Sequence, residues 1–204
     1  NCSVLESISI PDTVVNVGIN VFANPGKKIT ATFRGVDGVI DASVYDSKTT
    51  GIEYIAIDEN VNTIGDNAFA NSNTVSGVVI TDIDTIGESA FQNGKEMEYI
   101  EVGKANKIGK HAFSDTTTNR VELDDINVID DYAFSNCTNL NKLYIDSVIN
   151  INNYAFSNCI HIGKAYINSA KSINDYAFYN DAGMYDIVIE KNLMHIGEHA
   201  FDSC

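Results

Sequence analysis

The sequence predicts an α/β repeat solenoid of about nine repeats of about 22 residues, with one narrow parallel β-sheet and short helical turns on the other side. Three observations lead to this prediction. An Ile-Gly-x-x-Ala-Phe phrase recurs at 64–69, 86–91, 108–113 and 196–201. Its Ala-Phe pair persists where the glycine is replaced, at 133–134, 155–156 and 177–178. Each copy also holds a brief apolar alternation. Such a short period is typical of a solenoid, in which each unit buries its apolar side against its neighbours.

The strand of each repeat is predicted from the spacing of its apolar residues. Leu140, Leu143 and Ile145 lie three and then two residues apart, and the second interval is the period of a strand. Residues 143–145 are therefore expected to form a short parallel strand. The same phase recurs at Leu5-Ile8-Ile10, Ile52-Ile55-Ile57, Met97-Ile100-Val102, Ile162-Ala165-Ile167 and Met184-Ile187-Ile189.

The segment after the strand is predicted to turn tightly and then to form a short helical turn. Gly65 suits a turn that admits positive φ, and Asp66 stands where an acid favours the start of a helical turn. Ala68 is small where the turn presses on the next unit, and Phe69 is large enough to fill the interior. A ladder of phenylalanines is therefore expected along the axis: Phe22, Phe69, Phe91, Phe113, Phe134, Phe156, Phe178 and Phe201.

Residues 1–204 are expected to form a single solenoid domain, with an irregular repeat near residues 34–57, where Val44-Tyr45 replaces Ala-Phe. Neither end carries the polar cap that a solenoid needs, so we interpret the chain as a segment of a longer array. The four cysteines fall at one repeat phase and have no metal-ligand spacing. Free core thiols are expected from that phase: Cys2, Cys137, Cys159 and Cys204.

Composition and motifs argue against several classes of function. The formal net charge of −15 argues against nucleic acid and anionic membranes as partners. No apolar run approaches the roughly 20 residues of a membrane span, so no membrane insertion is expected. His195-x-x-Glu198-His199 matches a zinc-peptidase pattern, but Gly197 opens a turn where that motif needs a helix. From the residues we therefore expect no catalytic residue and no metal site.

The combination Ile-x-x-Ile-Gly-x-x-Ala-Phe-x-x-Cys-x-x-Leu-x-x-Ile-x-Ile resembles the repeat of the BspA-like, or treponemal-type, leucine-rich repeat family. That family often has a proline just after the strand, and Pro11 matches this habit. Other repeats depart from it, with Asp58, Thr81 and Asp146 in place of the proline. The resemblance covers essentially the whole chain and implies a right-handed leucine-rich-repeat array. It also implies an extracellular or cell-surface protein of anaerobic bacteria or parasitic protists, without enzyme activity or cofactor, that adheres to host or matrix proteins or to other cells.

The candidate site is the outward face of the predicted sheet, because side chains that flank the buried strand residues point outward. One outward column reads Ser7, Thr30, Tyr54, Gly77, Tyr99, Arg120, Lys142, Lys164 and Asp186. Its neighbour reads Ser9, Thr32, Ala56, Val79, Glu101, Glu122, Tyr144, Tyr166 and Val188. Three stacked cations stand out in a chain with 13 Lys and Arg, and Tyr and Arg are frequent binding hot spots. The predicted ligand-binding residues are Tyr99, Arg120, Lys142, Tyr144, Lys164 and Tyr166.

An ordinary solvated sheet is the alternative interpretation of this face, since exposed strands favour tyrosine on packing grounds alone. Arg120 or Lys142 would then only pair with Glu101 or Glu122. The leading hypothesis is adhesion to a host, extracellular-matrix or cell-surface protein, with a glycan as the alternative partner. A passive spacer and a carbohydrate-presenting accessory region are the rival functions. A further column, formed by Tyr132, Tyr154 and Tyr176, is interpreted as structural stacking.

Overall fold

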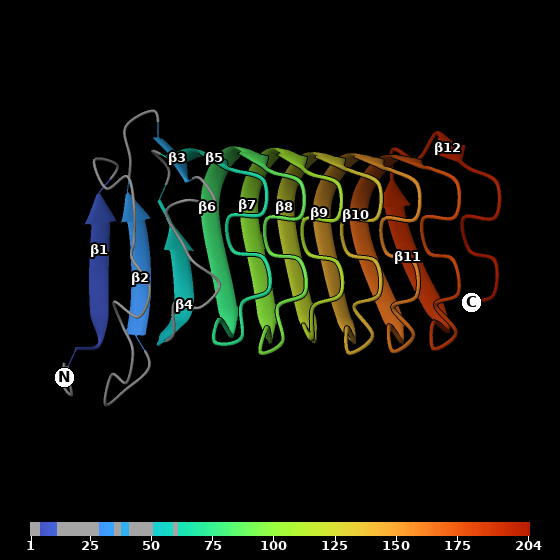
Figure 1. Ribbon diagram of the computed structural model, residues 1–204. Helices are drawn as coiled ribbons and strands as arrows, with labels where there is room; N and C mark the ends of the chain where they lie inside the picture. Colours follow the sequence, from blue (N-terminus) through green and yellow to red (C-terminus); the bar gives the residue numbers. More distant parts are fainter. Residues whose placement is uncertain (1–4, 12–28, 35–37, 41–50, 59–60) are drawn as a thin grey trace.

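The computed structural model describes residues 5–11, 29–34, 38–40, 51–58 and 61–204. Their strands run parallel and coil into a solenoid of about seven turns (Figure 1). The strands are β1 Ser7–Pro11, β2 Ile29–Arg34, β3 Gly38–Ile40, β4 Ile52–Ile57, β5 Val61–Ile64, β6 Gly77–Ile86, β7 Tyr99–Ile108, β8 Arg120–Ile129, β9 Lys142–Ile151, β10 Lys164–Ile173, β11 Asp186–Lys191 and β12 His195–Ile196. Among these residues no helix could span a membrane.

The strands of the regular turns are longer than the sequence predicted, because each continues around a bend. β6 to β10 have 10 residues each, whereas a strand of three residues was expected. In β8 the buried residues are Val121, Leu123, Ile126 and Ile129. The interval from Leu123 to Ile126 places two outward residues in succession, which interrupts the period of two. The sequence prediction covered only the alternating first half of each strand.

The second halves of these strands pair separately from the first halves. The path of neighbours is β1-β2-β4-β6-β7-β8-β9-β10-β11. Off this path, β3 pairs with β5, β5 pairs with the second half of β6, and β12 pairs with the second half of β10. Figure 1 shows β3, β5 and β12 at one edge of the molecule, beyond the bend. The prediction of a single narrow sheet is therefore incomplete, because the sheet continues around the bend into a second part. The number of nine repeats is not established, because the described residues form about seven turns.

The phenylalanine ladder is confirmed from Phe69 onward. Successive rings from Phe69 to Phe178 lie nearly parallel with centroids 4.9–5.1 Å apart, and Phe201 continues the stack at 5.5 Å. Phe33 packs edge-on against Phe69 at the other end, with an interplanar angle of 72°. Phe22 lies outside the described residues, as do Val44 and Tyr45.

The short helical turns of the prediction do not form in the part of the chain that the structure describes. Asn67 and Asn71 have φ of 59° and 61°, in the left-handed region that a right-handed helix cannot contain. The amide of Phe69 donates to the Ala90 carbonyl of the next turn, with N and O 2.7 Å apart. Equivalent positive φ values recur in every later turn. The backbone therefore bonds mainly between neighbouring turns, and the α/β assignment is replaced by a parallel β-solenoid.

The glycine of the repeat phrase serves close packing and not a positive φ. A Cβ on Gly87 would lie 2.7 Å from the Asp66 amide nitrogen, and one on Gly109 would lie 2.6 Å from the Ile86 carbonyl oxygen. Neither position has room for a side chain without a backbone shift. The left-handed positions lie two residues further on, at the phase of Asn67.

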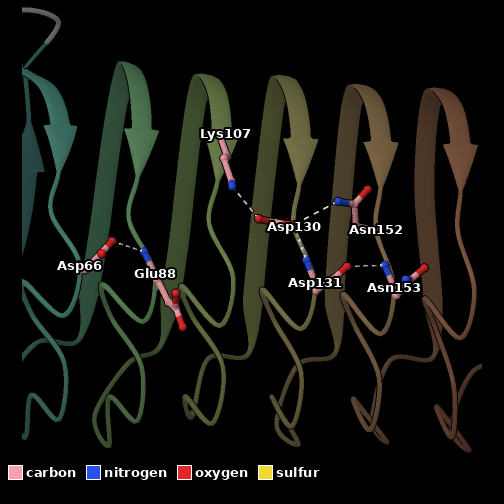
Figure 2. A network of polar contacts seen from close by, with 7 residues as sticks. All are labelled: Asp66, Glu88, Lys107, Asp130, Asp131, Asn152 and Asn153. Atoms are coloured by element: carbon pink, nitrogen blue, oxygen red, sulfur yellow. Dashed lines mark hydrogen bonds and ion pairs between the residues drawn. The ribbon is translucent and has the colours of Figure 1, made fainter.

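Polar side chains on the surface form rows of hydrogen bonds along the axis. Most rows begin at an aspartate, which accepts a bond from an asparagine one turn later, and one begins at Asn71, which accepts from Asn93 at 2.7 Å. The Asn152 amide donates to Asp130 Oδ1 at 3.1 Å, and the Asn174 amide donates to Asn152 Oδ1 at 3.3 Å. Figure 2 shows Asp130 between Asn152 and Lys107, whose Nζ lies 2.7 Å from Asp130 Oδ2. The other rows are Asp115–Asn136–Asn158–Asn180, Asp84–Asn106–Asn127 and Asp146–Asn168.

The cysteine column consists of free thiols, as predicted, for the three cysteines that the structure describes. Cys137 and Cys159 are buried and Cys204 is exposed, whereas Cys2 lies outside the described residues. Each of the three sulfurs lies 3.1–3.3 Å from a phenylalanine carbonyl oxygen of the preceding turn and donates to it. Burial raises the pKa of the Cys159 thiol well above its ordinary value. Asp181 occupies the same column between Cys159 and Cys204.

Candidate functional site

The strand register confirms both outward columns. Tyr99, Arg120, Lys142 and Lys164 are direct partners across β7, β8, β9 and β10. Tyr144 and Tyr166 pair in the neighbouring column, beside Glu122. All six predicted residues therefore lie on one continuous surface, which we call the sheet face.

Tyr99 is held at one end of the sheet face by a glycine of the preceding strand. A Cβ on Gly77 would lie 2.3 Å from Tyr99 Cε1, so the tyrosine ring occupies the space that a side chain at Gly77 would need. The ring thereby reaches Tyr54, with centroids 6.2 Å apart. Burial raises the pKa of Tyr99, and the nearby Tyr54, Glu101 and Glu53 add to this effect. Tyr99 is thus a half-buried, positioned ring.

Two of the three stacked cations are paired. Arg120 donates from Nε and Nη2 to Glu122 Oε1 at 2.9 and 2.5 Å, and both side chains remain partly exposed. Lys164 Nζ lies 2.8 Å from Asp186 Oδ2, and this hydrogen bond raises the pKa of Lys164. Exposed pairs of this kind contribute little to stability, because solvent screens the two charges.

Lys142 differs from both of its neighbours. It is exposed, lies in register between Arg120 and Lys164, and forms no ion pair with any residue that the structure describes. The charges of Arg120 and Lys164 are balanced by their acidic partners, whereas the charge of Lys142 is not. Lys142 is therefore the point of excess positive charge on the sheet face.

The tyrosine pair borders this point. The rings of Tyr144 and Tyr166 lie 6.4 Å apart at 46°, and Tyr144 is 49% exposed. The Tyr166 hydroxyl donates to Glu190 Oε1 at 2.6 Å, which raises the pKa of Tyr166. Tyr144 therefore presents a ring to solvent, while Tyr166 is tied to β11.

An acidic depression adjoins the tyrosines, and the sequence analysis did not predict it. It has a volume of about 280 Å³ and is lined by Glu122, Leu123, Asp124, Tyr144, Ile145, Asp146 and Tyr166. Burial raises the pKa of Asp124, and the charges of Asp146 and Glu122 raise it further. Asp124 and Asp146 are the first outward residues at the bend of β8 and β9. A strand predicted to end at Ile145 leaves them out of the site.

The column of Tyr132, Tyr154 and Tyr176 stacks as predicted, and a histidine extends it at each end. Centroid distances are 4.9 Å from Tyr132 to Tyr154 and 4.7 Å from Tyr154 to Tyr176. His111 stacks on Tyr132 at 5.1 Å, and His199 stacks on Tyr176 at 4.9 Å. All five residues have φ between 54° and 58°. The histidines share this phase, but only the tyrosines were recognised from the sequence.

The zinc-peptidase pattern has no corresponding geometry. His195 lies in β12, whereas His199 lies in a turn, where its Nδ1 is 3.1 Å from Asp202 Oδ2. No helix carries the two histidines together. Across the described ranges, no group of three or more His, Cys, Asp or Glu side chains is arranged to hold a metal ion.

Comparison with known structures gives three similar chains. A leucine-rich repeat protein from Bacteroides ovatus is 18% identical with a TM-score of 0.43; the match covers 98% of this chain and 64% of that protein. The pneumococcal vaccine antigen PcpA is 18% identical with a TM-score of 0.44, covering 97% of this chain and 60% of the antigen. A leucine-rich repeat protein from Eubacterium ventriosum is 12% identical with a TM-score of 0.29, covering 74% and 82%. This chain thus spans less than two thirds of the first two.

No curated protein sequence matches the chain. The family model described as "BspA type Leucine rich repeat region" matches residues 1–98, 39–141 and 106–204, in 6 copies. These matches together cover every repeat from which the solenoid was predicted. The chain therefore belongs to the BspA-type leucine-rich repeat family.

Proposed function

We propose that this chain is a non-enzymatic recognition segment that binds another protein through the sheet face. The observation that carries the proposal is the environment of Lys142. An exposed ammonium group with no ion-pair partner in the described chain lies between two balanced cations and beside the half-exposed ring of Tyr144. A partner's carboxylate would contact Lys142 without first displacing an internal pair.

The two signs of charge on this surface support a protein partner that docks in one orientation. The cationic column lies on one side of the tyrosine pair, and the depression with Glu122, Asp124 and Asp146 lies on the other. Complementary charges of this kind favour one register of a complex and disfavour the reverse. The tyrosines supply apolar area with little side-chain entropy to lose. Many modest contacts across successive turns would add up to useful affinity.

The compartment and the partner class belong to the same proposal. Membership of the BspA-type family supports a secreted or cell-surface protein that meets host, extracellular-matrix or cell-surface proteins. The acidic character of the chain, with a net charge of −15, favours partners other than nucleic acid.

A binding experiment with matched charge reversals tests the proposal. The chain would be immobilised and exposed to a panel of matrix and cell-surface proteins and to a glycan array. Lys142→Glu is expected to weaken protein binding at least about tenfold, since it reverses a charge at a contact. Lys171→Glu makes the same change at an exposed position of β10 beyond the bend, and it is expected to leave binding unchanged.

The outcomes separate the rival functions. Equal binding by the wild type and both variants would remove the sheet face from consideration. Binding to the glycan array alone would favour the carbohydrate-presenting region. No binding to either panel would leave the passive spacer as the better function.

A further inference from the structure

Asp181 is a buried carboxyl group in a column otherwise made of thiols, hydroxyls and glycine. Its side chain is fully buried. Asp181 Oδ1 accepts a hydrogen bond from the Cys159 amide at 2.7 Å, whereas Oδ2 has no hydrogen-bond partner. An ionised carboxylate here would be desolvated on one oxygen without compensation, which is costly.

The groups that face Asp181 offer no positive charge. The Cys159 thiol lies in the preceding turn and the Cys204 thiol in the following turn, and Cys137 lies one turn beyond Cys159. No Lys, Arg or His of the described residues forms an ion pair with Asp181. Burial raises the pKa of Asp181 to about 8, and the hydrogen bond from the Cys159 amide only partly opposes this. At neutral pH the carboxyl therefore carries a proton.

The neighbouring thiols show what a proton at this position does. Cys159 and Cys204 donate to the carbonyl oxygens of Phe134 and Phe178, each in the preceding turn. Phe156 provides the equivalent carbonyl for Asp181, and no hydrogen bond to it comes from any residue that the structure describes. A protonated Oδ2 is a donor, as a thiol is, and it stands at the repeat position from which the neighbouring thiols reach the carbonyl of the preceding turn.

We propose that Asp181 forms a pH-dependent hydrogen bond between adjacent turns. Its protonated form donates from Oδ2 to the Phe156 carbonyl and stabilises the turn that leads into β11. Deprotonation replaces this bond with repulsion between a carboxylate and a carbonyl oxygen. The Asp181 carbonyl also accepts from the Met184 amide at 2.8 Å, just before β11 begins. β11 in turn holds Asp186 and Glu190, the partners of Lys164 and Tyr166. Loss of the proton therefore loosens one end of the sheet face.

The sign of the pH dependence follows from proton linkage. The folded-state pKa is raised above the unfolded value of about 3.9, so between roughly pH 4 and 8 the folded chain binds one proton that the unfolded chain does not. The stability from Asp181 is fully present below pH 4 and falls as pH rises through that window. The folding equilibrium constant is expected to decrease by up to about tenfold for each pH unit.

Carboxyl-labelled aspartate in the whole chain gives a direct test by NMR. One carboxyl signal, assigned through its absence in Asp181→Asn, is expected to titrate near pH 8. Titration near pH 4 would overturn the proposal. Urea unfolding across the window supplies the second measurement. Asp181→Cys introduces the residue found at this position in the neighbouring turns. It is expected to abolish the decrease of the folding equilibrium constant, which in the wild type is up to about tenfold per pH unit. Asp125→Asn changes an exposed aspartate and is expected to leave that pH dependence unchanged.

Hydrogen exchange at matched pH locates the effect. At pH above 8, the amides of β11 are expected to exchange faster in the wild type than in Asp181→Cys, and at acid pH the two are expected to agree. Equal exchange at both pH values would contradict the proposal. These measurements require no ligand, so their failure would leave the binding proposal for Lys142 standing, and the reverse also holds.

Discussion

Truncation of Phe134 to alanine tests how much of the stability resides in the aromatic ladder. Phe134 is fully buried and stacks on Phe113 and Phe156, each at 5.1 Å. Burial of such a side chain contributes about 1.5–3 kcal/mol, and each stacked pair adds about 0.5–1.5 kcal/mol. The expected loss in free energy of unfolding is therefore about 4 kcal/mol, within the range of about 3–5 kcal/mol for core Phe→Ala changes.

Phe201→Ala provides the matched control, because this ring is only partly buried and has one stacked neighbour, at 5.5 Å. Its expected cost is about 2 kcal/mol, from half the burial and one pair. Urea unfolding followed by far-ultraviolet circular dichroism would measure both changes. Equal losses for the two variants, or a loss below about 1 kcal/mol for Phe134→Ala, would refute the reasoning that a continuous stack carries the core.

Three further predictions concern the surface. For Asp130, burial opposes ionisation, but hydrogen bonds from Lys107, from a backbone amide and from an asparagine amide outweigh it and lower the pKa. Its stabilising effect is therefore present above the unfolded pKa and lost as pH falls through the folded pKa, and Lys107→Met should flatten the acid limb of the melting temperature against pH. Tyr154→Asn and Tyr154→Ala both lose two stacked contacts, but urea unfolding should show alanine to be about 1 kcal/mol worse, because asparagine tolerates positive φ. Gly77→Ala should displace the ring of Tyr99 from its buried position and lower its pKa toward the ordinary value, as NMR titration of labelled tyrosine would show.

The repeat period was enough to predict the ladder and the columns of the sheet face. Adjacent turns pair in register, so a residue 22 positions away, or 21 between Tyr99 and Arg120, must be its spatial neighbour. The Arg120–Glu122 pair was one of the alternatives that the outward columns offered. These features depend on spacing alone.

The parts that were wrong depend on backbone conformation within a turn. Asp66 looked like the start of a helix, but left-handed residues at Asn67 and Asn71 prevent one. Asparagine at both positions was a usable signal for positive φ. The presence of tyrosine at the first of these phases in later turns, such as Tyr154, obscured it, since bulky residues rarely adopt this conformation. The acidic depression was missed for a related reason, because the bend after Ile145 breaks the strand alternation.

The rows of asparagine side chains give the solenoid a direction, because the donors within a row all point the same way along the axis. Every asparagine amide in the row from Asp115 to Asn180 donates toward the turn nearer the N-terminus, and the oxygens of Asn136 and Asn158 each accept from the following turn. The asparagine of a duplicated unit would donate to the side-chain oxygen of the preceding turn and so extend the row. A second molecule that docked end to end in the opposite sense would set oxygen against oxygen. Lengthening by whole, like-oriented copies is thus the change that this architecture accepts most readily.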